Sequence, residues 1–289
     1  MKILVIGNGF IATSIVHKLE AEGHEILVYS RKFNERIKRK QILGDIFQFS
    51  DFIGSLSWQP QIVINTAWIT THGIYRNDPS NYKYAEFAAR LARHVIQSDI
   101  EHLIFLGTCA EYGDQIQAST AGKTKLSPRD LYSKQKVEAF NSIKSTLLNS
   151  KIRFTWARIF YPYGPMQNPN RLIPYLIRSI KSITPINLSD TSSVLDWITT
   201  RDVASAIEWI INNESPIELD IGTSYGFTNV QILKLLEELL GTTTQWAQYS
   251  SLHVGPKLVS VVGKDSPLIK LGWRAKDDLN SGLEWVLNS

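Results

Sequence analysis

The chain has 289 residues, 43% of them apolar, so it can bury a large core and is neither a disordered tail nor a fibre. Its formal charge of +4 is local, because residues 31–40 hold six Lys or Arg and one Glu; we interpret this run as a solvated helix face, which argues against a nucleic-acid partner. The single cysteine, Cys109, excludes an intramolecular disulfide, and the apolar run near the N-terminus is too short for a secretion signal or a bilayer span, so a cytoplasmic protein with no membrane partner is expected.

The first elements predicted are a strand over residues 2–6 and a helix over residues 10–22, with apolar side chains at helical spacing. The turn between them reads Gly7-x-Gly9-x-x-Ala12. Gly7 permits a tight turn, Gly9 lets a pyrophosphate approach the backbone, and Ala12 allows close packing of helix and strand. The phosphates would lie at the positive end of the helix, so this turn predicts a dinucleotide site.

The second predicted strand, residues 24–30, ends at Ser30, Arg31 and Lys32. An NAD enzyme usually offers an acidic residue to the ribose hydroxyls at this place, and none is present. A guanidinium at Arg31, with Lys32, suits the 2′-phosphate of NADP. The sequence therefore favours NADP over NAD, with two solvated loop cations as the simpler alternative.

Further apolar strands are predicted over residues 61–67, 102–108 and 153–159, with longer helical stretches between them. This alternation predicts an α/β fold, a doubly wound parallel (Rossmann) sheet. After residue 164 the texture changes to short strands with more Pro, Ser and Thr. We expect a dinucleotide-binding domain over 1–164, to which parts of 186–212 return, and a smaller substrate-binding lobe formed mainly by 165–289.

Tyr132 and Lys136 lie four residues apart, on one face of a helix that we expect to begin with Ser127 as its N-cap. A phenol is too weak a base at neutral pH unless nearby positive charge stabilises its anion, and Lys136 supplies that charge. Thr108, at the end of a predicted strand, would hydrogen-bond the same substrate oxygen. These three residues predict hydride transfer at a secondary alcohol carbon.

In order, the chain carries the segments GNGFIA, INTAW, LGTCAEYG, YSKQK, ARIFYPYGP, NRLIPYLI, LDWITTRDVASAI, LDIGTSYG and LGWRAKDDLNSGLEWVL. In this order and spacing it resembles the extended short-chain dehydrogenases/reductases, the epimerase/dehydratase family that acts on nucleotide sugars, almost end to end. The resemblance implies that Thr108, Tyr132 and Lys136 are catalytic and that a nucleoside-diphosphate sugar is bound. The site residues it implies are Gly7, Gly9, Phe10, Ile11, Asp45, Ile46 and Ala67 for the cofactor, and Asn168, Arg171 and Leu172 for the substrate.

Three positions depart from the family pattern. Ile6 stands where another glycine usually begins the nucleotide turn, Glu86 replaces a common asparagine, and Leu195 replaces a cation before the aspartate of DWI. Part of the contact with the substrate phosphates must therefore come from elsewhere in the chain. Loops 70–80, 114–126 and 186–194 are expected to set the nucleobase and sugar specificity.

Family members that dehydrate a hexose carry an acidic pair directly after the catalytic Thr, where this chain has Cys109 and Ala110. Glu111 is one residue too far along and is expected to bond backbone or solvent. We therefore favour NADPH-dependent reduction of a 4-keto-6-deoxy sugar. A C4 epimerase that retains NAD is the alternative, and a catalytically silent nicotinamide-binding protein is a third.

The helix over residues 81–97 and the helix carrying Tyr132 pair across a two-fold axis in the family, which implies a homodimer. The six histidines show no ligand spacing, and no metal site is expected.

Overall fold

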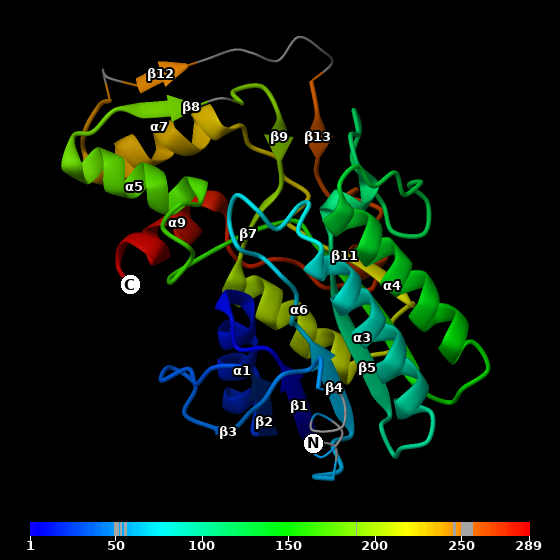
Figure 1. The fold of residues 1–289 in the computed structure, drawn as a ribbon. Helices are drawn as coiled ribbons and strands as arrows, with labels where there is room; N and C mark the ends of the chain where they lie inside the picture. The colour runs from blue at the N-terminus through cyan, green and yellow to red at the C-terminus, as the bar shows by residue number, and fades with distance from the viewer. Residues whose placement is uncertain (49–51, 53, 55–56, 189, 245–246, 250–256) are drawn as a thin grey trace.

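A single parallel sheet lies at the centre of the molecule, drawn from a computed structural model (Figure 1). The described residues are 1–48, 52, 54, 57–188, 190–244, 247–249 and 257–289. In the order β11-β6-β5-β4-β1-β2-β3, the strands are β1 (Lys2–Ile6), β2 (Glu25–Ser30), β3 (Lys40–Leu43), β4 (Ile62–Asn65), β5 (His102–Thr108), β6 (Arg153–Ile159) and β11 (Glu218–Ile221). Their near-continuous apolar runs fit a sheet that is buried on both faces.

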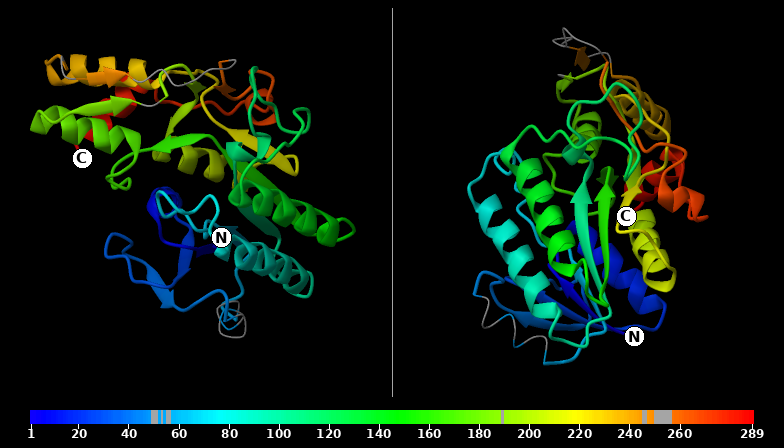
Figure 2. Two further views of the ribbon diagram at one scale, coloured as in Figure 1. Left: turned by 45° about the horizontal axis from the view of Figure 1, so that its top comes forward. Right: turned by 90° about the vertical axis from the view of Figure 1, so that its right-hand side faces the viewer.

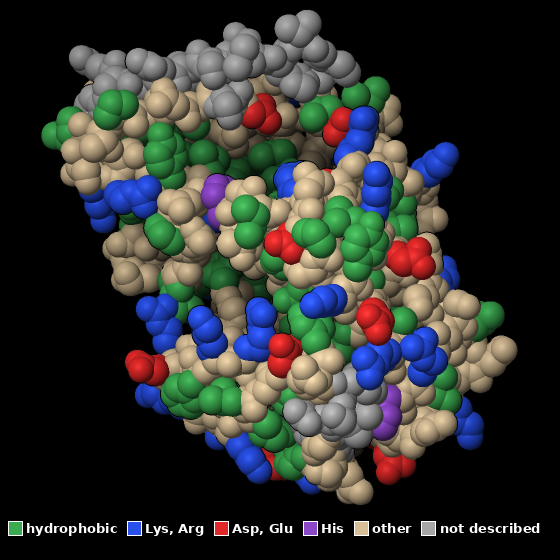
Figure 3. All heavy atoms as spheres, in the orientation of Figure 1, with side chains coloured by type: hydrophobic (Ala, Val, Ile, Leu, Met, Phe, Trp, Pro, Cys, Tyr) green, Lys and Arg blue, Asp and Glu red, His purple; other side chains and the backbone are tan. Residues whose placement is uncertain are grey.

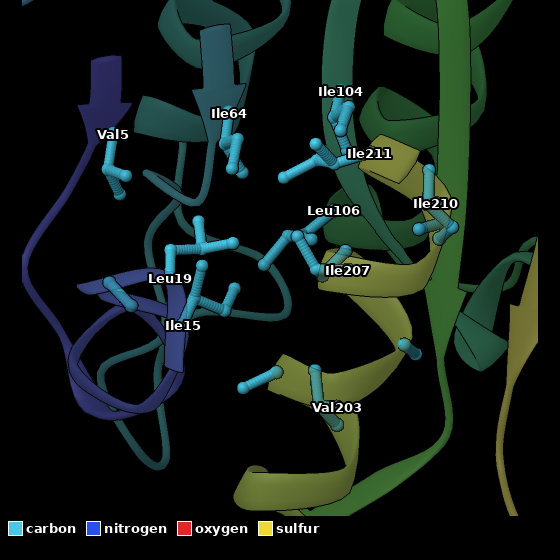
Figure 4. Packing of buried hydrophobic residues seen from close by; sticks show 14 of the residues in the cluster. Val5, Ile15, Leu19, Ile64, Ile104, Leu106, Val203, Ile207, Ile210 and Ile211 are labelled. Atoms are coloured by element: carbon cyan, nitrogen blue, oxygen red, sulfur yellow. The ribbon is translucent and has the colours of Figure 1, made fainter. Parts of the chain in front are cut away.

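One face of the sheet is covered by α1 (Phe10–Ala21) and α6 (Thr200–Asn212). Figure 4 shows how Ile15 and Val203 from these helices meet strand residues such as Ile64 in one apolar cluster. The apolar positions of α1 recur at helical spacing because only one stripe of the helix faces the sheet. This packing fixes the N-terminus of α1 at the carboxyl end of β1.

The opposite face is covered by α3 (Ser80–Val95) and α4 (Leu131–Leu147), which lie side by side (Figure 2, right view). Leu91 and Ile143 are fully buried there with Phe105 of β5. The doubly wound fold expected from the alternation of strands and helices is therefore confirmed.

The other elements form a smaller lobe beyond the carboxyl edge of the sheet (Figures 1 and 2). They are η1 (Cys109–Tyr112), β7 (Tyr161–Tyr163), α5 (Leu172–Ser182), β8 (Ile186–Leu188), β9 (Val194–Leu195), β10 (Trp197–Thr199), α7 (Asn229–Leu240), β12 (Ala247–Tyr249), β13 (Val259–Ser260), α8 (Pro267–Lys270) and α9 (Leu279–Leu287). Much of this lobe packs around its own apolar cluster, which includes Leu176, Leu233 and Leu283.

The return of the chain to the sheet extends beyond the predicted residue 212. β11 pairs in parallel with β6, with Leu219 opposite Ala157, and so belongs to the central sheet. Leu268 of α8 packs in the same core as α1 and α6. The two lobes are therefore joined by several crossings of the chain.

Two sequence expectations are wrong in detail. α4 begins at Leu131 with Asp130 as its N-cap, not Ser127, because the Asp130 carboxylate accepts the Ser133 N–H at 2.8 Å while the Ser127 N–H is bonded to the Glu111 carbonyl. The basic run 31–40 is not a helix face, since it consists of turns and loop up to Lys40, the first residue of the edge strand β3. Its charges are nevertheless mostly exposed.

Candidate active site

A cleft of about 880 Å³ lies at the carboxyl ends of the central strands, between the sheet and the smaller lobe (Figure 3). Lys and Arg side chains gather along the lower edge of this hollow in the figure. Open α/β sheets bind their ligands at this edge. Sixteen predicted site residues line the cleft: Gly7, Gly9, Phe10, Ile11, Ala12, Ser30, Arg31, Lys32, Ile46, Ala67, Thr108, Tyr132, Lys136, Asn168, Arg171 and Leu172.

The turn after β1 forms a cradle of backbone. Gly7 has a φ of +99°, and a Cβ there would lie 2.5 Å from the Thr66 hydroxyl oxygen, so only glycine fits. A Cβ at Gly9 would meet no atom within 4 Å, because this residue faces open space at the N-terminus of α1. That N-terminus has no side-chain cap, which leaves its first amides for an anion. The cradle therefore fits a dinucleotide pyrophosphate.

The expected glycine at position 6 is not needed for this turn. Ile6 is fully buried, and its carbonyl accepts hydrogen bonds from the Thr66 N–H at 2.9 Å and from the Thr66 hydroxyl at 2.7 Å. The Gly7 N–H donates to the Tyr29 carbonyl at 2.8 Å. The loop is thus anchored on both neighbouring strands.

The far end of the cradle holds the cations predicted to select NADP. Arg31 and Lys32 are exposed on the rim of the cleft. The Ser30 hydroxyl and the Asn8 amide both donate to the Lys32 carbonyl, and so fix the backbone at this corner. No carboxylate lines the cleft among the described residues, so both cations are available for an anion.

Asp45 is the one predicted site residue that does not line the cleft. Its carboxylate accepts a hydrogen bond from the Phe47 N–H at 3.0 Å, so the side chain is bonded within its own loop. The neighbouring Gly44 and Ile46 do line the cleft, so this loop borders the cleft as expected through other atoms.

Thr108 and Tyr132 meet at the end of β5. Burial raises the pKa of Tyr132 well above its ordinary value, and the interaction with the Thr108 side chain offsets only part of this rise. The Tyr132 N–H donates to the Arg76 carbonyl at 2.8 Å, which ties the start of α4 to the loop after β4. The pocket thus holds the phenol in its protonated form.

Lys136 is almost fully buried, 4% exposed, directly behind Tyr132. Its Nζ donates to the Leu106 carbonyl at 2.6 Å and lies 4.0 Å from the centre of the Trp68 ring and 5.9 Å from that of Tyr132. Burial lowers the pKa of Lys136 to about 7, against the opposing effect of the Glu111 charge. Trp68 was not predicted, although it stands in the INTAW segment.

Glu111 accepts a hydrogen bond from the backbone, as expected, but its side chain does not reach solvent. Its side chain is fully buried and accepts hydrogen bonds from Thr108, Trp156 and Arg158. Burial raises the pKa of the neighbouring Cys109 thiol to about 12, so this cysteine is a neutral, buried side chain.

The side of the cleft that is predicted to bind the substrate contains two arginines around one tyrosine. The Arg171 guanidinium lies 5.3 Å from the centre of the Tyr75 ring and donates to the Thr70 carbonyl. Arg76 also lines the cleft and pairs with Asp130 at 2.7 Å. Tyr75 and Arg76 belong to loop 70–80, whose conformation the sequence pattern could not supply.

Two of the three positions that depart from the family pattern, Glu86 and Leu195, do not line the cleft, whereas Ile6 does. Glu86 is exposed and pairs with Arg90, and Leu195 bridges to Phe227 inside the smaller lobe. Residue 189 of loop 186–194 lies outside the described residues. In the described part of the chain, no group of three or more His, Cys, Asp or Glu is arranged to hold a metal ion, and no helix is long and apolar enough to cross a membrane.

The NAD dependent epimerase/dehydratase family matches the chain over residues 3–222. The low-salt glycan biosynthesis protein Agl12 of Haloferax volcanii is 24% identical over 192 residues, covering 65% of this chain and 61% of the relative. The dTDP-D-glucose 4,6-dehydratase of Mus musculus is 22% identical over 202 residues, 67% of this chain and 57% of the relative. The chain thus spans about three fifths of the length of these relatives.

A solved structure of UDP-glucose 4-epimerase from Thermotoga maritima, with UDP-glucose, superposes with a TM-score of 0.89. It is 22% identical in sequence, and the match covers 100% of this chain and 98% of that chain. A likeness at this identity shows that the fold is shared.

Proposed function

The chain belongs to the NAD dependent epimerase/dehydratase family, and from that membership we propose that it reduces the 4-keto group of a nucleoside-diphosphate 4-keto-6-deoxy sugar. The observation that carries the proposal is the placement of Thr108, Tyr132 and Lys136 at one end of a cleft whose other end is the phosphate cradle. The nicotinamide cofactor supplies the hydride when bound. The carbonyl carbon gains that hydride, and the carbonyl oxygen gains a proton from the protein.

The protein's residues control that proton. The buried Tyr132 hydroxyl is protonated in the resting cleft and donates its proton to the substrate oxygen as negative charge develops there. The Thr108 side chain interacts with this hydroxyl and fixes the substrate oxygen at the same point. The Lys136 ammonium behind the ring stabilises the phenolate that remains.

Dehydration, the alternative chemistry of the family, would need an acid-base pair next to Thr108, and these positions do not supply one. Cys109 is buried and neutral, and Ala110 carries no functional group. Glu111 is fully occupied by three donors and has no exposed surface. Reduction requires none of these positions, because it needs only Thr108, Tyr132, Lys136 and the cofactor.

The charges of the cleft support NADPH and a diphosphate substrate. Arg31 and Lys32 stand at the ribose corner of the cradle, where a 2′-phosphate would lie. Arg171 and Arg76, with Asn168, line the opposite side and supply cationic and amide donors for a nucleotide diphosphate. We also propose that the protein acts in the cytoplasm.

A C4 epimerase that retains NAD is the second candidate. It uses the same three residues and adds only a rotation of the keto intermediate between two hydride transfers. Its support is the same cleft, whose lining contains the three residues that this chemistry needs.

We also propose a homodimer formed through α3 and α4. The two helices lie side by side on the outer face of the sheet, with Tyr82 of α3 and Leu148, the residue that follows α4, largely exposed. Light scattering on the purified protein gives the mass directly: twice the chain mass supports the dimer, and a single chain mass contradicts it.

The function is tested by mixing the protein with NADPH and a 4-keto-6-deoxy nucleotide sugar while following the absorbance of the reduced nicotinamide. Net consumption of NADPH, with a reduced sugar as product, supports the reductase. Tightly bound NAD released on denaturation, with interconversion of C4 epimers and no net consumption, supports the epimerase instead. Binding of cofactor without any turnover would leave a silent binding protein.

A further inference from the structure

A buried carboxylate lies behind the catalytic Thr108 and takes no part in the proton transfer described above. The Glu111 side chain has no exposed surface. Its Oε1 accepts the Thr108 backbone N–H at 2.8 Å, its Oε2 accepts the Arg158 Nε–H at 2.7 Å, and the Trp156 indole N–H donates to both oxygens. A Cβ at Gly107 would lie 2.8 Å from Oε1, so β5 has no side chain where the carboxylate approaches it.

The partner of this carboxylate is a second buried charge. Arg158, on β6, is fully buried, with its guanidinium 5.3 Å from the centre of the Tyr112 ring and 5.1 Å from that of Phe140. Its Nη1 pairs at 2.8 Å with Glu218 of β11, whose side chain is 22% exposed. The group Glu111–Arg158–Glu218 therefore carries a net charge of −1 across three adjacent elements.

A contribution to folding stability alone does not explain why these charged side chains are buried together. Removing charges from water costs several kcal/mol per ion, and apolar replacements of similar size are often neutral or stabilising. The location is informative, because Glu111 and Thr108 cap η1 reciprocally and so fix the backbone that carries the Thr108 hydroxyl. Two residues earlier on the same strand, the Leu106 carbonyl holds the Lys136 ammonium.

We propose that Glu111 is a positioning residue for the catalytic centre, which holds the backbone at the end of β5, where Thr108 is carried and where the Leu106 carbonyl holds the buried Lys136. Arg158 holds Glu111 in turn. The inference rests on the proposed function, because it assigns Thr108 and Lys136 their roles in hydride transfer.

Several charged or titratable groups surround this pair. Lys136 lies 5.9 Å from the centre of the Tyr132 ring on its own helix, and the Glu111 charge on η1 raises its pKa against the larger effect of burial. On the other side of Glu111 lie Arg158 on β6 and Asp220 on β11, the latter bonded to the Tyr112 hydroxyl and the Ala121 N–H, with burial raising its pKa to about 7. Of these, Glu111 is the carboxylate that favours the charged form of Lys136.

The decisive variant is Glu111→Gln, because an amide has one acceptor oxygen where the carboxylate offers two to its three donors. We expect kcat to fall by about 10- to 100-fold with little change in KM, the size of effect seen when reacting groups are displaced slightly. The lost charge favours neutral Lys136, so the alkaline limb of the pH profile should move to lower pH.

Glu218→Gln is the matched control. It removes the same charge and replaces the ion pair with Arg158 by at most a neutral hydrogen bond, but Glu218 does not touch Thr108. We expect nearly unchanged kcat and an alkaline limb that moves less than in Glu111→Gln. Equal effects of the two variants, or full activity of Glu111→Gln with an unmoved pH profile, would overturn the proposal.

A double variant covers the case in which Glu111→Gln does not fold. Glu111→Leu with Arg158→Met removes both buried charges together and leaves Glu218 free to reach water. We expect a lower but measurable melting temperature, because the Thr108 and Trp156 N–H groups lose their acceptor, and the same loss in kcat. A folded double variant with wild-type kcat would show that the pair is structural only.

Failure of the proposed reaction is distinguishable from failure of this inference. If the wild type binds NADPH but turns over no 4-keto sugar, the proposed function fails, and the inference is then read from the pH dependence of NADPH affinity. Quenching of tryptophan fluorescence reports that affinity. The inference predicts that NADPH affinity falls as the pH rises, and that this fall begins at a lower pH in Glu111→Gln than in Glu218→Gln. Superimposable affinity profiles of the two variants contradict it.

Discussion

At the phosphate cradle the chain presents backbone to the cleft, whereas at the catalytic end it presents buried ionisable side chains. Gly7 and Gly9 have no side chain, and recognition there depends on the shape of a turn and the amides of α1. Lys136 and Glu111, in contrast, are charges held at or near zero exposure. The cradle should therefore be sensitive to added volume and insensitive to pH, and the catalytic end should be sensitive to charge and pH.

The largest effect is expected from Tyr132→Phe, which removes the proton donor and keeps the ring packed against Tyr75. Loss of a general acid lowers kcat by about 10²- to 10⁴-fold. NADPH affinity should change much less, because the cradle is untouched. Single-turnover rates and fluorescence titration measure the two quantities, and a variant with wild-type kcat would rule out the proposed role of this tyrosine.

Substitutions at the two glycines of the cradle should distinguish an effect on folding stability from an effect on cofactor binding. Gly7→Ala forces an unfavourable φ and a clash with Thr66, a strain of about 1–3 kcal/mol, so both the melting temperature and the NADPH affinity should fall. Gly9→Ala places its methyl group in open space where the pyrophosphate would lie. The NADPH affinity should therefore fall while the melting temperature remains unchanged. If both variants lose stability equally, the assignment of Gly9 to ligand approach is wrong.

The pH dependence should come from the catalytic end. The pKa of Lys136 is lowered to about 7, and the lysine is active when charged, so kcat/KM should fall as pH rises through about 7. Lys136→Met should show low activity without that limb. An unchanged limb in this variant would assign it to another group, such as Asp220, whose pKa is raised to about 7.

The smallest effect is expected at the exposed rim of the cradle. Arg31→Ala should raise KM for NADPH by roughly tenfold or more, the loss of one charge-assisted hydrogen bond, and leave KM for NADH nearly unchanged. Lys32→Ala is the parallel variant for the neighbouring cation. Equal effects on both cofactors would contradict selection of the 2′-phosphate by this corner.

The accuracy of the predictions from sequence also differs between these two regions. The cradle could be predicted because Gly7, Gly9 and Ala12 are contiguous and their requirement is local backbone geometry. The alternation of strands and helices likewise predicted the sheet, but not the edge strand β3, which is short and starts at a charged residue.

The catalytic surroundings were only partly predictable. Tyr132 and Lys136 share one helix face, but Arg158 reaches Glu111 from a strand 47 positions further along the chain. Tyr75 and Arg76 belong to an irregular loop whose path depends on the Tyr132 N–H and on Asp130. No periodicity encodes such contacts, because they exist only once the sheet has assembled.

The most direct test of the account is to run the reaction with NADPH that carries deuterium at the transferable position of the nicotinamide, and to locate the label in the product by mass spectrometry and NMR. The account predicts one deuterium on C4 of the reduced sugar for each NADPH consumed. A product formed without deuterium at C4 would contradict reduction of the 4-keto group by this enzyme.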